Sequence, residues 1–180
     1  MADSDEVFVY LGAYDNKANA LADVDVIRGW HSAHMVDRFE VAVISKDDRG
    51  RVHVKERDSS THSTAVVGAV VGVIVGLIFP VSLVGSAAVG LAAGVEAGRA
   101  GNAGLQAIPR ADLTALGQLI NAGEFGIVVV GDATVLQVIE NAKLQPVRQK
   151  SHRTHGSFGD LERDVKVLIA PSASEPSQPD

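Results

Sequence analysis

The sequence predicts an α+β protein: a ferredoxin-like split βαβ sandwich into which an apolar helical hairpin with a glycine zipper is inserted. Two observations carry this prediction. Residues 7–21 and 127–139 share one pattern, which is an apolar strand, a glycine-containing turn, an aspartate cap and an amphipathic helix. Between these weak repeats, residues 64–95 contain many glycines and no charged side chain. The ferredoxin-like topology places the first strand of each repeat in the middle of the sheet, and these two strands are the most continuously apolar ones here.

The repeats and the insertion divide the chain into four expected parts. Residues 1–60 form the first βαβ half with a β-hairpin, 61–107 the glycine-zipper hairpin, 108–150 the second half, and 151–180 a C-terminal extension whose tail is disordered from about 171.

The first repeat predicts a strand at residues 6–11, because EVFVYL is an apolar run rich in β-branched and aromatic residues. Gly12 should end this strand, and Asp15 should cap a helix over residues 16–31. The remaining elements of this half are a strand at 39–44, a turn at 46–50 and an alternating, half-exposed strand at 51–55.

The central segment predicts two helices that pack through glycine. Glycines at every fourth position share one helix face and leave a groove that another backbone can approach closely. The residues that form this packing are Gly68, Gly72, Gly76, Gly85, Gly90, Gly94 and Gly98. Pro80 lacks an amide hydrogen, so the chain should reverse there, and Ser63 or Thr64 should cap the first helix. Since that helix has no polar face, we expect lipid or the hairpins of other copies to surround it, ahead of a core within its own chain.

The second half predicts a helix, a strand, a helix and a strand. Pro109 suits the first turn of a helix, and Asp132 should cap the next one. The first helix has the apolar stripe Leu113, Leu116 and Ile120, and the second has Val135, Leu136 and Ile139. The ranges are 127–130 for the central strand, 133–142 for its helix, 145–150 for the last strand, and 160–169 for a short extra element.

The composition excludes several kinds of chemical site and partner. The chain has 180 residues, a formal net charge of −6 and no cysteine, which excludes disulfides, thiolate metal sites and a cysteine nucleophile. No block of lysine and arginine is present, so we expect no nucleic-acid partner. The acidic start of the chain does not resemble a secretory signal peptide, so we expect the folded parts on the cytoplasmic side.

The order of elements resembles a known family. The stretches VISKDDRGRVHVKE, IPRADLTALGQLI and GIVVVGDATVLQVIENA, with the glycine hairpin and its proline tip, are similar to the bacterial domain-of-unknown-function 1269 family over residues 7–150. The resemblance implies a predicted bacterial membrane protein with a link to stress. It implies no reaction, because that family has no settled activity.

Candidate chemical sites are few. His31 and His34 are three residues apart, as are His152 and His155, and this spacing makes them weak candidates for metal ligands. We expect packing or a helix C-terminal role for His31 and His34 and solvent exposure for His152 and His155, and therefore no metal and no cofactor. Glu96 and Arg99 interrupt the second arm and form either an ion pair at the base of the hairpin or a polar ring in an assembly. We find no catalytic constellation and expect a protein that is not an enzyme.

Three functions remain open. The first is a non-enzymatic, membrane-associated protein that self-associates through transmembrane glycine-zipper helices on the cytoplasmic side of the inner membrane, with itself and lipid as partners. The second is a cytoplasmic structural protein that buries its hairpins in a large homo-oligomer. The third is a sensor of a small ligand or a metal.

Overall fold

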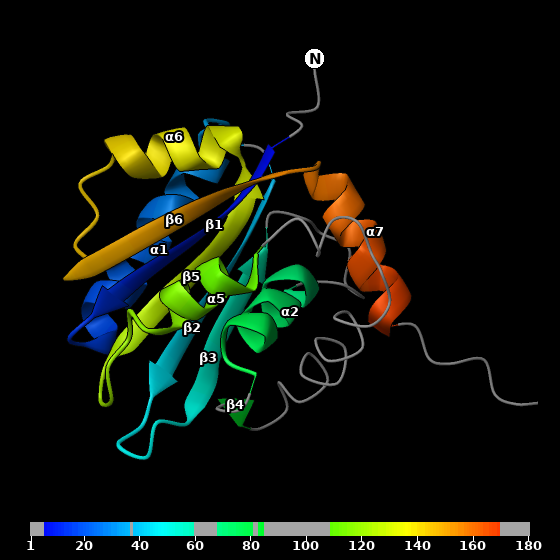
Figure 1. Cartoon of the computed structure of the whole chain (residues 1–180). Coiled ribbons are helices and arrows are strands. Elements are labelled where there is room, and N and C mark those ends of the chain that lie inside the picture. The colour runs from blue at the N-terminus through cyan, green and yellow to red at the C-terminus, as the bar shows by residue number, and fades with distance from the viewer. Residues whose placement is uncertain (1–5, 37, 60–67, 81–82, 85–108, 170–180) are drawn as a thin grey trace, which may run out of the picture.

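We describe a computed structural model of the chain over residues 6–36, 38–59, 68–80, 83–84 and 109–169. These residues form a mixed α and β structure in which five antiparallel strands and one short parallel strand make a sheet, and five helices pack on its two faces (Figure 1). The expectation of an α+β fold is confirmed at this level.

The strands form one sheet in the order β4-β3-β2-β5-β1-β6. Their bounds are β1 (Glu6–Tyr14), β2 (Phe39–Lys46), β3 (Val52–Ser59), β4 (Leu83–Val84), β5 (Phe125–Asp132) and β6 (Arg148–His155). All neighbouring pairs are antiparallel except the short pair of β3 and β4, which is parallel. The first strands of the two repeats, β1 and β5, lie side by side in the middle of the sheet, as the sequence predicts.

The helices cover the sheet in two layers. Their bounds are α1 (Lys17–Ser32), α2 (Ala69–Ile78), α5 (Arg110–Gly117), α6 (Ala133–Asn141) and α7 (Phe158–Ile169). The helices α1 and α6 pack on one face, whereas α2, α5 and α7 pack on the other (Figure 1). The side chains of β1 alternate between the layers: Val9 and Leu11 face α2, and Tyr10 faces α1.

The α1/α6 face is built as its sequence pattern predicts. Ala20, Val24 and Ile27 of α1 are buried, as are the inward-facing residues predicted for α6. Asp132 caps α6 and accepts hydrogen bonds from the amides of Thr134 and Val135, which confirms the predicted cap. The cap of α1, however, is Asn16 and not Asp15, because the Asn16 side chain accepts the hydrogen bond from the amide of Asn19.

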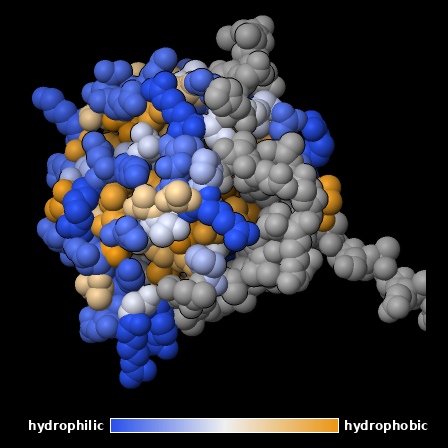
Figure 2. All heavy atoms as spheres, in the orientation of Figure 1, coloured by the Kyte–Doolittle hydropathy of each residue, from blue (hydrophilic) through white to orange (hydrophobic). Residues whose placement is uncertain are grey.

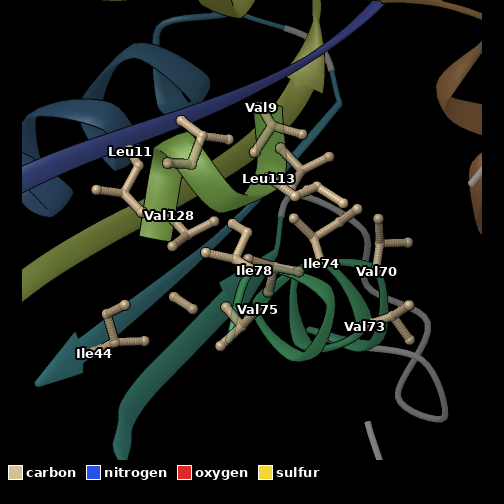
Figure 3. Packing of buried hydrophobic residues seen from close by; sticks show 14 of the residues in the cluster. Val9, Leu11, Ile44, Val70, Val73, Ile74, Val75, Ile78, Leu113 and Val128 are labelled. Atoms are coloured by element: carbon tan, nitrogen blue, oxygen red, sulfur yellow. The ribbon is translucent and has the colours of Figure 1, made fainter. Parts of the chain in front are cut away.

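The opposite face is aliphatic, and α2 lies at its centre. Figure 3 shows Ile74 and Ile78 of α2 beside Leu113 of α5 and Val128 of β5. Helix α7 adds the buried side chains of Phe158, Leu161 and Val165 to this layer, which confirms the extra element expected after residue 160. The surface of the described part is mostly hydrophilic in the view of Figure 2, with apolar atoms between the charged side chains.

Several predicted boundaries are wrong. Strand β1 continues through Gly12 to Tyr14, and β6 runs from Arg148 to His155 instead of over residues 145–150. Strand β3 extends to Ser59, beyond the predicted end at residue 55. In the first case a glycine is present because of side-chain packing and not because a turn begins. The Cβ of any larger residue at position 12 would lie 2.9 Å from the hydroxyl oxygen of Tyr10.

The expectation of a membrane-spanning hairpin needs correction. Within the described residues, no helix combines the length and the apolar content that crossing a bilayer requires. Helix α2 has ten residues, which corresponds to about 15 Å, or half of the ~30 Å hydrocarbon core. The expectation of a membrane protein with transmembrane helices is therefore wrong for the described residues. The apolar circumference of α2 has a different cause, since the chain's own sheet and helices bury it.

Candidate functional site

In the first predicted glycine series, Gly72 and Gly76 lie on α2 and Gly68 precedes it, and Gly68 and Gly72 lie against Arg57 of β3. Gly68 precedes the helix with φ of +72°, a left-handed conformation that favours glycine. A Cβ at Gly68 would lie 3.0 Å from the Cβ of Arg57, and a Cβ at Gly72 would lie 3.3 Å from the Nη1 atom of the same arginine. The Arg57 side chain therefore lies along the glycine face. Gly76 is also buried, and Pro80 is exposed two residues after the end of α2.

The rest of the predicted hairpin is not placed. Gly85, Gly90, Gly94, Gly98, Glu96 and Arg99 lie outside the residues that the structure describes, as do the expected caps Ser63 and Thr64. Between the two glycine series, Leu83 and Val84 form the short strand β4 beside β3. The described part of the segment is thus one buried helix followed by one strand.

The candidate histidines do not come together as a metal centre. Nδ1 of His31 lies 3.3 Å from the carbonyl oxygen of Val36, and its ring makes an edge contact with Phe39. His34 is exposed, and Nδ1 of His152 lies 3.5 Å from a carboxylate oxygen of Asp112. The backbone of His155 ends β6. In the part of the chain with described coordinates, no three His, Cys, Asp or Glu side chains form a group that could hold a metal ion.

The most unusual group in the described structure is Glu40, which the sequence analysis did not single out. Its side chain is 1% exposed and points from β2 into the aliphatic layer, where the sheet meets α2. One carboxylate oxygen, Oε2, accepts a hydrogen bond of 2.8 Å from the amide of Val71 in the first turn of α2. Burial raises the pKa of Glu40 to about 7, although the amide of Val71 acts in the opposite direction.

Glu40 acts as the cap of α2. The first amides of a helix have no carbonyl partner within the helix, and Gly68 has no side chain that could supply one. The amides of Val70 and Val71 both bond to the Glu40 carboxylate, which lies about 30 residues away along the chain. The glycine helix therefore depends on a distant buried acid for the contact that α6 obtains from its neighbour Asp132.

A second buried polar group lies on the α1/α6 face. The hydroxyl of Tyr14 donates a 2.7 Å hydrogen bond to Asp23 of α1, and the amide of Gln145 donates to the same carboxylate oxygen. The hydroxyl of Tyr10 donates to Gln149 of β6. Burial raises the pKa of both tyrosines, and the charge of Asp23 beside Tyr10 and its hydrogen bond with Tyr14 raise it further. Both hydroxyls therefore remain protonated and serve as donors.

These residues carried weak signals in the sequence. Glu40 is the one charged residue within FEVAVI, and Asp23 interrupts the inward-facing positions of the first helix. A charged residue in a buried run either marks a bulge or a buried cap, and the sequence alone does not distinguish them. No family model, no curated protein and no solved structure matches the chain.

Proposed function

We propose that the protein is a non-enzymatic structural protein that associates with copies of itself by exchanging its glycine-rich helix. In this proposal α2 leaves the site it occupies in its own chain and fills the same site in a partner copy. The globular α+β part carries that site, and the homo-oligomer is the functional form. The membrane-inserted form is not part of this proposal, because no helix within the described residues is long and apolar enough to cross a bilayer.

One observation carries the proposal: α2 is an uncharged helix whose binding site is built by distant parts of the chain. The surrounding residues come from β2, β5, α5 and α7, and eight of the ten residues of α2 are buried. Because the helix is joined to this site by contacts and not by adjacency in sequence, the same helix from another copy makes the same contacts. Exchange of identical elements is a common route to symmetric dimers.

The proposed fold is the ferredoxin-like split βαβ arrangement, with α2 and the rest of the glycine-rich segment inserted between its halves. The strand order β2-β5-β1-β6 and the antiparallel pairs support it. The resemblance to the domain-of-unknown-function 1269 family is likewise a proposal. A zipper between two arms stays a prediction for the second glycine series.

A disulfide that links α2 to its site tests the exchange. The chain has no cysteine, so the double variant Arg57→Cys with Gly68→Cys contains a single pair of thiols. A Cβ at Gly68 lies 3.0 Å from that of Arg57, close to the separation of about 3.5–4.5 Å in disulfides. After oxidation, exchange joins two chains, so a covalent dimer is expected on a denaturing gel without reductant.

The outcomes are distinct. A crosslink that stays within one chain shifts the monomer band and contradicts exchange. The two single-cysteine variants are the matched controls, because neither can close this link, and they must give no dimer at the same protein concentration. Light-scattering mass of the wild-type protein completes the test, since a particle of 18.8 kDa at all concentrations contradicts self-association altogether.

A further inference from the structure

The contact between Glu40 and α2 is a place in the described structure where a proton can act directly on the glycine helix. Glu40 is buried, and within residues 68–80 the helix segment carries no charged side chain. On β5, the residue paired with Glu40 is Val130, which is apolar. Among the described residues, Arg57 of β3 and Glu162 of α7 act on the carboxylate from the elements packed around it.

We infer that Glu40 is a proton-dependent latch, which holds α2 in its site when the carboxyl group is neutral and weakens that hold when it is ionised. The geometry supplies the reason. An ionised carboxylate that is 1% exposed has lost its hydration, and two amides with one nearby arginine replace only part of it. Undocking α2 opens the site to water, so the charge favours the undocked state.

The direction of the pH effect follows from the two protonation equilibria. The pKa of Glu40 is about 7 in the docked state and 4.5 in water. The raised value means that the docked state binds the proton more tightly, so this contribution is complete below pH 4.5 and is lost as pH rises through 7. Between pH 6 and pH 8, the ratio of docked to undocked α2 should fall about tenfold.

One consequence of the latch, faster exchange of α2 between copies above pH 7, rests on the proposed function. The latch itself does not. Its own test is amide hydrogen exchange of the wild-type protein at pH 6 and pH 8. Protection factors, which correct for base catalysis of exchange, should fall about tenfold for the amides of 72–78. The amides of β1 and β5 are the internal reference and should change little.

Three variants test whether titration of Glu40 causes the fall in protection. Glu40→Gln has the size of glutamate and cannot titrate, so the fall between pH 6 and pH 8 should disappear. Glu162→Gln removes a negative charge and lowers the pKa of Glu40, so the fall should shrink. Arg57→Gln removes the positive charge, raises that pKa and should steepen the fall. The last two keep Glu40 itself, so they test the latch even where Glu40→Gln unfolds.

Two results overturn the latch: equal protection of α2 at the two pH values in the wild type, or a fall that Glu40→Gln and Glu162→Gln leave unchanged. Failure of the proposed function looks different. In that case protection of α2 changes with pH as expected, while the oxidised double-cysteine variant gives no covalent dimer at pH 6 or pH 8.

Discussion

Both faces of the sheet bury carboxylates, and Asp23 on one face and Glu40 on the other serve different purposes. On the α1/α6 face, Asp23 accepts hydrogen bonds from the hydroxyl of Tyr14 and the amide of Gln145, so it links a helix, a strand and a loop. On the opposite face, Glu40 accepts hydrogen bonds from the first turn of α2. Asp23 therefore links elements of a layer whose helices have caps of their own. Glu40, in contrast, is itself the cap of α2.

This difference shows how each layer depends on the rest of the molecule. The helices α1 and α6 begin with side chains of their own, Asn16 and Asp132, so their first turns are satisfied locally. Helix α2 begins with a glycine, and its first turn is satisfied only after β2 has formed and α2 has docked on it. The aliphatic layer should therefore be the one that opens separately, which is the behaviour that exchange between copies requires.

The largest expected effect comes from emptying the centre of the aliphatic layer. Ile74 of α2 is fully buried, so Ile74→Ala should lower the free energy of unfolding by about 3 kcal/mol, through lost burial and the cavity left behind. Chemical denaturation measures this loss. Val26→Ala on α1 is the control, since Val26 is 43% exposed, and a change within about 0.5 kcal/mol is expected there.

The variant Ile74→Ala also tests whether the two layers open separately. If the aliphatic layer opens on its own, hydrogen exchange in Ile74→Ala should quicken in α2 far more than in α1. An equal increase in both helices would mean that the two layers open together, and the separate role given to α2 would be wrong.

The next effect concerns the buried acid of the other face. Asp23 is 4% exposed, so Asp23→Ala leaves the hydroxyl of Tyr14 and the amide of Gln145 without their acceptor. We expect a loss of about 2 kcal/mol in the free energy of unfolding, measured by urea denaturation. Asp25→Ala, two residues along the same helix and exposed, should cost less than about 1 kcal/mol. Similar losses for the two variants would contradict the structural role of Asp23.

Much of the sheet could be predicted from the sequence, because its signals are local. The apolar runs of β1 and β5 and the periodicity of α6 each appear within one segment, and the matching repeats indicate how the strands are ordered. The predicted strand boundaries are wrong where a contact between residues that are not sequence neighbours determines the structure. Gly12 was expected to end β1, but two tyrosine hydroxyls that converge above it explain the glycine.

The candidate site was harder to predict for a physical reason. An apolar helix with a glycine every four residues is compatible with lipid, another helix or a core, and only the tertiary structure shows that Arg57 of β3 lies against Gly68 and Gly72. The role of Glu40 depends on two segments about 30 residues apart, so no local pattern contains it. The second glycine series remains a prediction, because it lies outside the described residues.

The smallest expected effect concerns the ion pair that joins α1 to β3 at the surface. Nε of Arg28 lies 2.5 Å from a carboxylate oxygen of Asp58, but both side chains are more than a third exposed. Arg28→Gln should therefore lower the free energy of unfolding by less than about 1 kcal/mol in dilute buffer, and the loss should shrink in 0.5 M salt. Arg163→Gln, which removes an exposed pair on α7, is the matched control on the other face. A loss above about 2 kcal/mol that persists in salt would mean that this pair fastens the α1 layer to the sheet edge. Surface ion pairs, and not the buried acids Asp23 and Glu40, would then explain why the two layers differ in stability.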